Sequence, residues 1–169
     1  MRLENREIGK VENRKTILGG LAGAVFVALL LGIAWRSQHV LEAGLPPKTL
    51  CASEADARER ALLDIVAHGG SLLVTSGTPS MEPYIVGRAY GVYISRPFAE
   101  VPVGRLILYH PVGGTAGLSP ESILCHVLAA RDTAGGIPSG LHNARSEAWG
   151  RVTEANFVGE VVAIYSWPQ

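Results

Sequence analysis

The chain has little lysine and no excess of charge of either sign. Its 169 residues include three lysines, Lys10, Lys15 and Lys48, and the formal net charge is zero. Proteins that hold nucleic acid through its phosphates carry clusters of Lys and Arg, and residues 36–169 contain no such cluster. The sequence therefore argues against nucleic-acid binding and favours peptides or lipids as partners.

Cysteine is equally scarce. Cys51 and Cys125 are the two cysteines of the chain, and no His/Cys spacing of the zinc-binding type is present. Two cysteines allow either one disulfide or two free thiols, and the sequence alone does not choose between them. There is also no internal repeat, so a solenoid is excluded.

One long segment, residues 16–35, contains no charge. Twenty residues at about 1.5 Å per residue reach about 30 Å, the thickness of the hydrocarbon core of a bilayer. Five Lys/Arg precede the segment in residues 1–15 and two follow it in residues 36–50, which predicts a cytoplasmic N-terminus 1–15 and a transmembrane anchor 16–35. A cleaved secretory signal is the alternative, although its apolar region is only about 7–15 residues long.

The remaining residues predict one mainly β, antiparallel domain. Residues 36–70 are expected to form a juxtamembrane linker and a helix, which begins at a capping box at Ser53 and ends near His68 before two glycines. The β domain is expected to cover 71–169. Its strands are predicted from β-branched and aromatic runs at 71–75, 89–95, 105–110, 122–131 and 159–166, with loops at 111–120 and 133–148.

The segment from Thr78 to Pro83, Thr-Pro-Ser-Met-Glu-Pro, is a candidate nucleophile site. Each proline fixes its own φ and restricts the residue before it, so Ser80 is predicted to lie on a rigid loop after the strand 71–75. A serine held in this way is either a nucleophile or part of an ordinary turn. The choice depends on a base elsewhere in the chain.

His126 is the best candidate for that base. Two lysines precede the predicted anchor and Lys48 lies just after it, so a lysine base would have to come from the linker. His126 lies in the middle of the longest strand-like run, and an ordinary imidazole pKa of about 6.5 suits proton transfer, with activity lost between about pH 5.5 and 7.5. The alternative is a core histidine bonded to a carbonyl. Cys125 points to the opposite face of the strand and cannot pair with His126.

Together these residues resemble a type I signal peptidase. Thr78 to Pro83 matches the nucleophile box of that family, and residues 126–132 resemble the base-bearing strand of its endoplasmic reticulum and archaeal branch, in which histidine replaces the bacterial lysine. Residues 140–159 resemble the C-terminal box of bacterial members. The boxes follow one another in the family's order over residues 71–165.

The resemblance implies the fold, activity and location. The fold would be the antiparallel β domain that this family shares with self-cleaving repressors, with one N-terminal transmembrane helix. The activity would be a membrane-anchored serine endopeptidase, without a cofactor, that cleaves signal peptides or similar exported precursors at small side chains. Ser80 and His126 would be catalytic, and Thr78 with the N–H of Ser80 would form the oxyanion hole. The catalytic domain would lie outside a prokaryotic inner or plasma membrane.

The chain departs from the family at three acids. Arg88, Arg105 and Leu141 each follow a glycine where family members usually have Gly-Asp, and the third aspartate supports the dyad. Candidate substitutes are His142, Asn143, Ser146 and Asp132. These losses keep a second interpretation open, a catalytically impaired relative that binds exported peptides or acts as a membrane scaffold. A self-cleaving repressor is disfavoured, because its members use lysine and are cytoplasmic.

Overall fold

A computed structural model of the chain describes residues 44–112, 118–142 and 150–169. The predicted cytoplasmic segment 1–15 and the predicted anchor 16–35 lie outside these ranges. Among the described residues, no helix combines the length and the apolar character that a membrane crossing requires.

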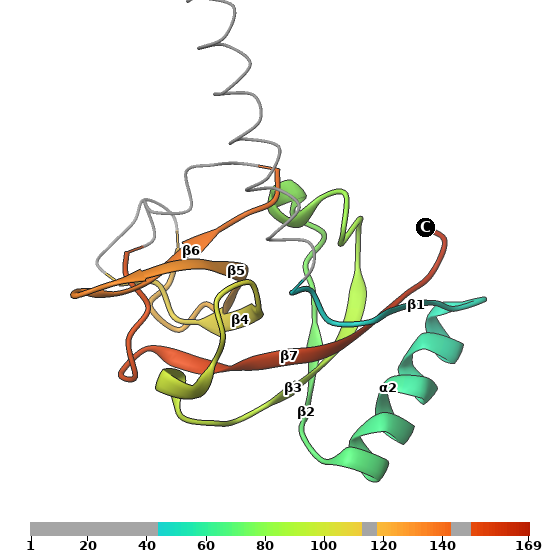
Figure 1. Cartoon of the computed structure of the whole chain (residues 1–169). Helices are drawn as coiled ribbons and strands as arrows, with labels where there is room; N and C mark the ends of the chain where they lie inside the picture. Colours follow the sequence, from blue (N-terminus) through green and yellow to red (C-terminus); the bar gives the residue numbers. More distant parts are fainter. Residues whose placement is uncertain (1–43, 113–117, 143–149) are drawn as a thin grey trace, which may run out of the picture. The chain divides into compact units, whose positions relative to one another are not determined.

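The sheet contains seven strands and is mainly antiparallel (Figure 1). Six of them follow one another in the order β2-β3-β7-β4-β5-β6, each antiparallel to its neighbours, and β1 pairs in parallel with β7. The predicted mainly β class is therefore confirmed. The strands are β1 (Lys48–Leu50), β2 (Ser71–Val74), β3 (Ala89–Ile94), β4 (Leu106–Tyr109), β5 (Leu124–Asp132), β6 (Gly135–Ser139) and β7 (Phe157–Ser166).

Helix α2 (Glu54–His68) begins and ends where the sequence predicts. The Ser53 side chain accepts a hydrogen bond of 3.2 Å from the N–H of Asp56, which caps the first turn. At the other end Gly69 adopts a φ of 81°, a left-handed conformation that favours glycine, and its N–H bonds the carbonyl of Ile65.

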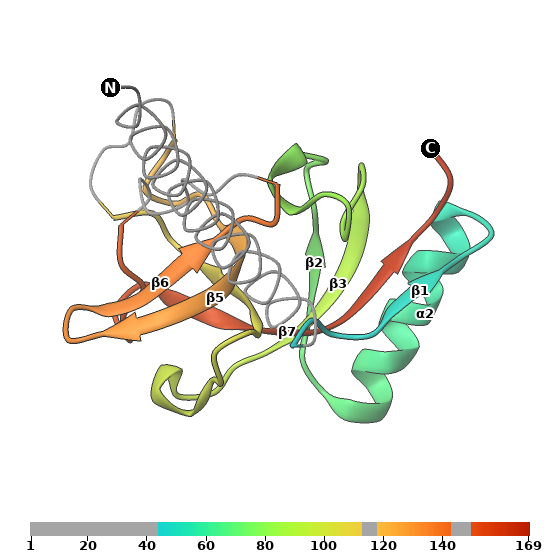
Figure 2. The ribbon, with the colours of Figure 1, turned by 45° about the horizontal axis from the view of Figure 1, so that its top comes forward.

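The helix packs on the sheet through small side chains. Ala57 and Ala61 are fully buried, and they belong to one core cluster with Tyr90 and Val92 of β3 and Ala163 of β7. Figures 1 and 2 show α2 and β1 beside the same end of β7. The folded unit therefore extends N-terminally of residue 71, because β1 pairs with β7 and α2 packs on the sheet.

Strand β6 lies within residues 133–148, which were predicted to form a loop, so that prediction is wrong. The glycines and proline that suggested a loop are compatible with this strand because it is at the edge of the sheet. A Cβ on Gly136 would lie 2.6 Å from side-chain atoms of Leu128 and Phe98, so the close packing of β6 favours glycine at this position. Pro138 pairs with Leu128 of β5 at the edge.

Strand β4 forms the buried centre that fixes the site. All four of its residues are 0% exposed, and the strand lies between β7 and β5. Leu106 and Leu108 pack in a cluster with Met81, whereas Ile107 and Tyr109 pack in a cluster with Phe98. Because β5 pairs with this buried strand from Leu124 to Val127, β4 fixes the position of His126.

Candidate functional site

The loop between β2 and β3 carries the predicted nucleophile and is closed at its base. The N–H of Ala89 donates to the Thr75 hydroxyl at 2.7 Å, and the N–H of Thr75 donates to the carbonyl of Ala89 at 2.9 Å. Gly77 has a φ of 75°, and a Cβ there would lie 3.2 Å from the backbone of Gly87. The two arms of the loop are therefore held together below Ser80.

Ser80 lies in a single 3₁₀ turn, η1 (Pro79–Met81). Met81 is 3% exposed and packs into the core, so it anchors the turn. Thr78 precedes the turn in an extended conformation, and its hydroxyl forms no capping hydrogen bond. Because N–H groups in the first turn of a helix have no intrahelical acceptor, the N–H of Ser80 and the Thr78 hydroxyl both remain suited to bind an anion.

His126 lies on β5 and is 4% exposed. Its Nδ1 is 2.8 Å from the hydroxyl of Tyr109, and the ring makes no other hydrogen bond to a described residue. Burial lowers the pKa of His126 to about 4. The imidazole is therefore neutral at neutral pH, and the loss of activity predicted between about pH 5.5 and 7.5 is corrected to a lower range because that prediction used the pKa of an exposed ring.

Thr78, Ser80 and His126 are all among the residues that line one cavity of about 380 Å³. The His126 ring nevertheless lies on the Tyr109 face of β5, whereas Met81 packs on the opposite face. The turn η1 lies against β5, with Cα atoms of the two elements within 8 Å. No hydrogen bond joins the Ser80 hydroxyl to His126 among the interactions of the described residues. A second hollow, of about 310 Å³, lies on the exposed side of α2 and has no serine or histidine in its lining. The first cavity is therefore the one that contains the candidate catalytic residues.

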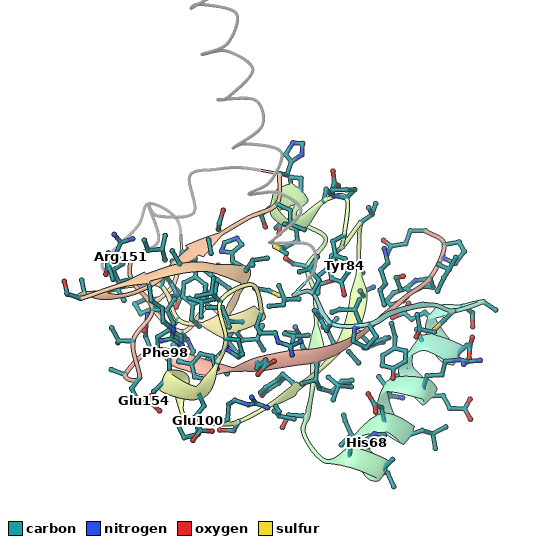
Figure 3. The ribbon with its side chains drawn as sticks, viewed as in Figure 1. His68, Tyr84, Phe98, Glu100, Arg151 and Glu154 are labelled. Carbon is teal, nitrogen blue, oxygen red and sulfur yellow. The ribbon has the colours of Figure 1, made fainter. Side chains whose placement is uncertain are left out.

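Of the four predicted supporting residues, the structure places one at the site. The N–H of His142 donates to the carbonyl of Ser80 at 3.1 Å, although the His142 side chain is exposed. Asp132 lies at the far end of β5, about 20 Å along the strand from His126, and pairs at 2.9 Å with Arg151, which Figure 3 labels. Asn143 and Ser146 lie outside the described residues.

The rival base and the rival nucleophile have other environments. Lys48 donates to the backbone carbonyl of Tyr84, labelled in Figure 3, at 2.7 Å and does not line the cavity. Cys125 does line it, but burial raises the pKa of the thiol to about 12, so the thiol stays protonated and is not activated. Cys51 and Cys125 are both free, which answers the question that the sequence left open.

Two of the three residues that stand in place of the family's acids, Arg88 and Arg105, form ion pairs. Arg88 lies 3.7 Å from Glu54, and Arg105 lies 3.4 Å from Glu160, whose side chain is buried. Leu141 is partly buried against the core cluster that contains Met81. The two arginines thus form ion pairs within the folded domain. Leu141, which packs in the same cluster as Met81, supplies no carboxylate to the site.

Sequence reasoning missed Tyr109, the partner of His126. The two residues are diagonal neighbours across β4 and β5, because Tyr109 pairs with Leu124 and Ile107 pairs with His126. A polar ring at the end of an aliphatic run was the available signal. The register of the two strands, which brings the groups together, does not follow from the length of the intervening loop.

Comparison of the chain with family models, with curated proteins and with solved structures finds no match in any of the three. The geometry of the cavity and the motifs of the sequence are thus the observations that bear on function. They converge on Ser80, because the predicted nucleophile and the predicted base line one cavity.

Proposed function

We propose that this chain is a membrane-anchored serine endopeptidase similar to type I signal peptidases, and that it cleaves signal peptides or similar exported precursors at small side chains. The observation that carries the proposal is the cavity lined by Thr78, Ser80 and His126. The proposed nucleophile and the proposed base lie far apart in the sequence, and the sequence motifs predict both residues without reference to the cavity. The antiparallel β architecture agrees with the same resemblance.

The proposed reaction is acyl transfer to Ser80. A neutral His126 takes the hydroxyl proton as the Ser80 oxygen attacks the scissile carbonyl, and the oxyanion is held by the N–H of Ser80 and the hydroxyl of Thr78. The protonated imidazole then gives its proton to the leaving amine. Water, deprotonated by the same ring, hydrolyses the acyl-enzyme and restores Ser80.

The open edge of β2 supports a peptide substrate. Among residues 44–112, 118–142 and 150–169, β2 is an end strand of the sheet and pairs with β3 alone, so an extended peptide can add to its outer edge. Leu73 and Val74 of β2 line the cavity beside Ser80, together with Ile123 from the segment before β5. These apolar residues form part of the lining of the cavity of about 380 Å³, and we propose that the cavity accepts small side chains next to the cut.

The proposed setting is a prokaryotic inner or plasma membrane. The uncharged segment 16–35 would span the bilayer, and the excess of Lys and Arg in residues 1–15 would keep the N-terminus in the cytoplasm. The catalytic domain would then meet precursors at the outer face. The partners of the chain are thus the lipid bilayer and the exported precursor.

A second candidate, a catalytically impaired relative that binds exported peptides or acts as a membrane scaffold, is favoured by one observation. The His126 ring is deeply buried, and its pKa of about 4 makes it a weak base. Proton transfer is slower when the pKa of the base lies far below the working pH. The same cavity would then hold a peptide without cutting it.

A fluorophosphonate probe separates the two candidates. We expect it to label the wild-type protein at Ser80, because the probe reacts with activated serines, and we expect Ser80→Ala to remove the label. Ser76→Ala is the matched control, since Ser76 lines the same cavity but lies outside the nucleophile turn. Equal labelling of wild type and Ser80→Ala, or no labelling of the wild type, would contradict the endopeptidase and leave the binding protein.

A further inference from the structure

The hydrogen bond between Tyr109 and His126 connects two deeply buried side chains. Tyr109 is 0% exposed and His126 is 4% exposed, and the phenolic oxygen lies 2.8 Å from Nδ1 of the imidazole. Among the described residues, this ring nitrogen is the single hydrogen-bond partner of the Tyr109 hydroxyl. The bond therefore decides how both groups carry their protons.

The direction of this bond follows from the need of a buried O–H for an acceptor. A hydroxyl withdrawn from water loses free energy when its proton has no acceptor, and Nδ1 is the acceptor at hand. Burial raises the pKa of Tyr109 and lowers that of His126, so the phenol keeps its proton and the imidazole is neutral. Tyr109 thus donates to Nδ1, and the one proton of the neutral ring lies on Nε2.

This arrangement gives the opposite of what a general base needs. Nδ1 is occupied by Tyr109, so Nε2 is the ring nitrogen that the proposed reaction leaves for Ser80. With its proton in place, Nε2 can donate a hydrogen bond but cannot accept the proton of the Ser80 hydroxyl. A carboxylate beside Nδ1 accepts a hydrogen bond from Nδ1–H, which keeps the ring proton on Nδ1 and leaves Nε2 free, whereas a phenol that donates to Nδ1 does the reverse.

We propose that Tyr109 is a positioning residue that holds His126 in the Nε2–H tautomer, so that the Ser80 site rests in a state of low activity. The inference rests on the proposed function of Ser80 and His126. The competent tautomer places the proton on Nδ1, which then donates to the Tyr109 oxygen and leaves the phenolic proton without an acceptor. The competent form is therefore the minor one. In a serine protease, holding the wrong tautomer lowers kcat about 10⁴-fold.

The variant Tyr109→Phe removes the hydroxyl and keeps the ring that fills the core. We expect the rate constant for fluorophosphonate labelling of Ser80 to rise about tenfold, equivalent to about 1.4 kcal/mol, because the competent tautomer no longer leaves a buried O–H unpaired. Tyr165→Phe is the control, since that hydroxyl donates to Asp64 of α2 at 3.0 Å and lies outside the cavity lining. The control is expected to label at the wild-type rate.

Nitrogen-15 NMR of wild-type His126 tests the tautomer independently of activity. We expect a proton-bearing Nε2 and a proton-free Nδ1 at pH 7. A proton on Nδ1, or a labelling rate that is unchanged or lower in Tyr109→Phe, would overturn the inference. If the Nε2–H tautomer is found but neither wild type nor Tyr109→Phe labels, the tautomer assignment stands and the proposed function of Ser80 fails.

Discussion

Replacing His126 by alanine is expected to lower the cleavage of a precursor peptide with small residues at the cut by about 10²- to 10⁴-fold in kcat/KM. The imidazole is the proposed acceptor of the Ser80 proton and the proposed donor to the leaving amine. Lys48→Ala should leave kcat/KM close to the wild-type value, because the Lys48 ammonium bonds the carbonyl of Tyr84 and does not line the cavity. Steady-state kinetics of the full-length protein in detergent compares the three proteins.

The pH dependence of cleavage by the wild type is a second test of His126 as the base. The active form has a neutral imidazole, and burial lowers the pKa of His126 to about 4. Activity should therefore persist as the pH falls through 6.5, the pKa of an exposed imidazole, and should drop about tenfold per pH unit only below about 4. Loss of cleavage in Lys48→Ala with retention in His126→Ala would show that the segment before β2 supplies the base.

Thr78→Val should lower kcat by about 10²- to 10³-fold, the effect of losing one oxyanion donor. The hydroxyl of Thr78 makes no capping hydrogen bond, and valine keeps the branched shape of the side chain. The melting temperature should therefore stay close to that of the wild type. Kinetics with a precursor peptide and a thermal melt of the same preparation measure the two quantities.

Thr75→Val provides the contrasting control. The Thr75 hydroxyl accepts the N–H of Ala89 at 2.7 Å, so its removal leaves that donor without its partner and lowers stability by about 1–3 kcal/mol. We expect Thr75→Val to lower the melting temperature and Thr78→Val to lower kcat. A wild-type kcat in Thr78→Val would show that the Thr78 hydroxyl is not part of the oxyanion hole.

Much of the fold could be predicted because local patterns specify it. Helix α2 follows from its capping box and the glycine at its end, and the five predicted strands correspond to β2, β3, β4, β5 and β7 within a few residues. The sequence does not predict the short strand β1, and it predicts a loop where the structure has β6. Both depend on pairing with distant segments, β1 with β7 and β6 with β5, and neither has a run of β-branched residues to reveal it.

The candidate site divides in the same way. Thr78, Ser80 and His126 were selected from motifs and strand position, and the structure places all three on one cavity. The hydrogen bond between Tyr109 and His126 and the lowered pKa of His126 could not be predicted, because the first depends on the register of β4 and β5 and the second on burial. Both features exist only once the sheet is assembled, so local sequence patterns do not reveal them.

If the proposed function holds, burial of His126 and its bond to Tyr109 predict a slow enzyme. A pKa of about 4 makes His126 a poor proton acceptor at neutral pH, and the proposed Nε2–H tautomer reduces the competent population further. The absence of an acid at Leu141 fits the same trend. We therefore expect turnover on a dedicated precursor, measured over long incubations, to be more informative than a survey of many peptides in short ones.

The distance from the Ser80 Oγ to the nearer imidazole nitrogen of His126, measured in a crystal structure of the wild-type protein, tests the central claim most directly. The Ser-His dyad predicts a separation within about 4 Å, allowing for the looseness of sites without substrate. A separation beyond about 7 Å, or an apolar side chain between the two groups, would contradict the dyad.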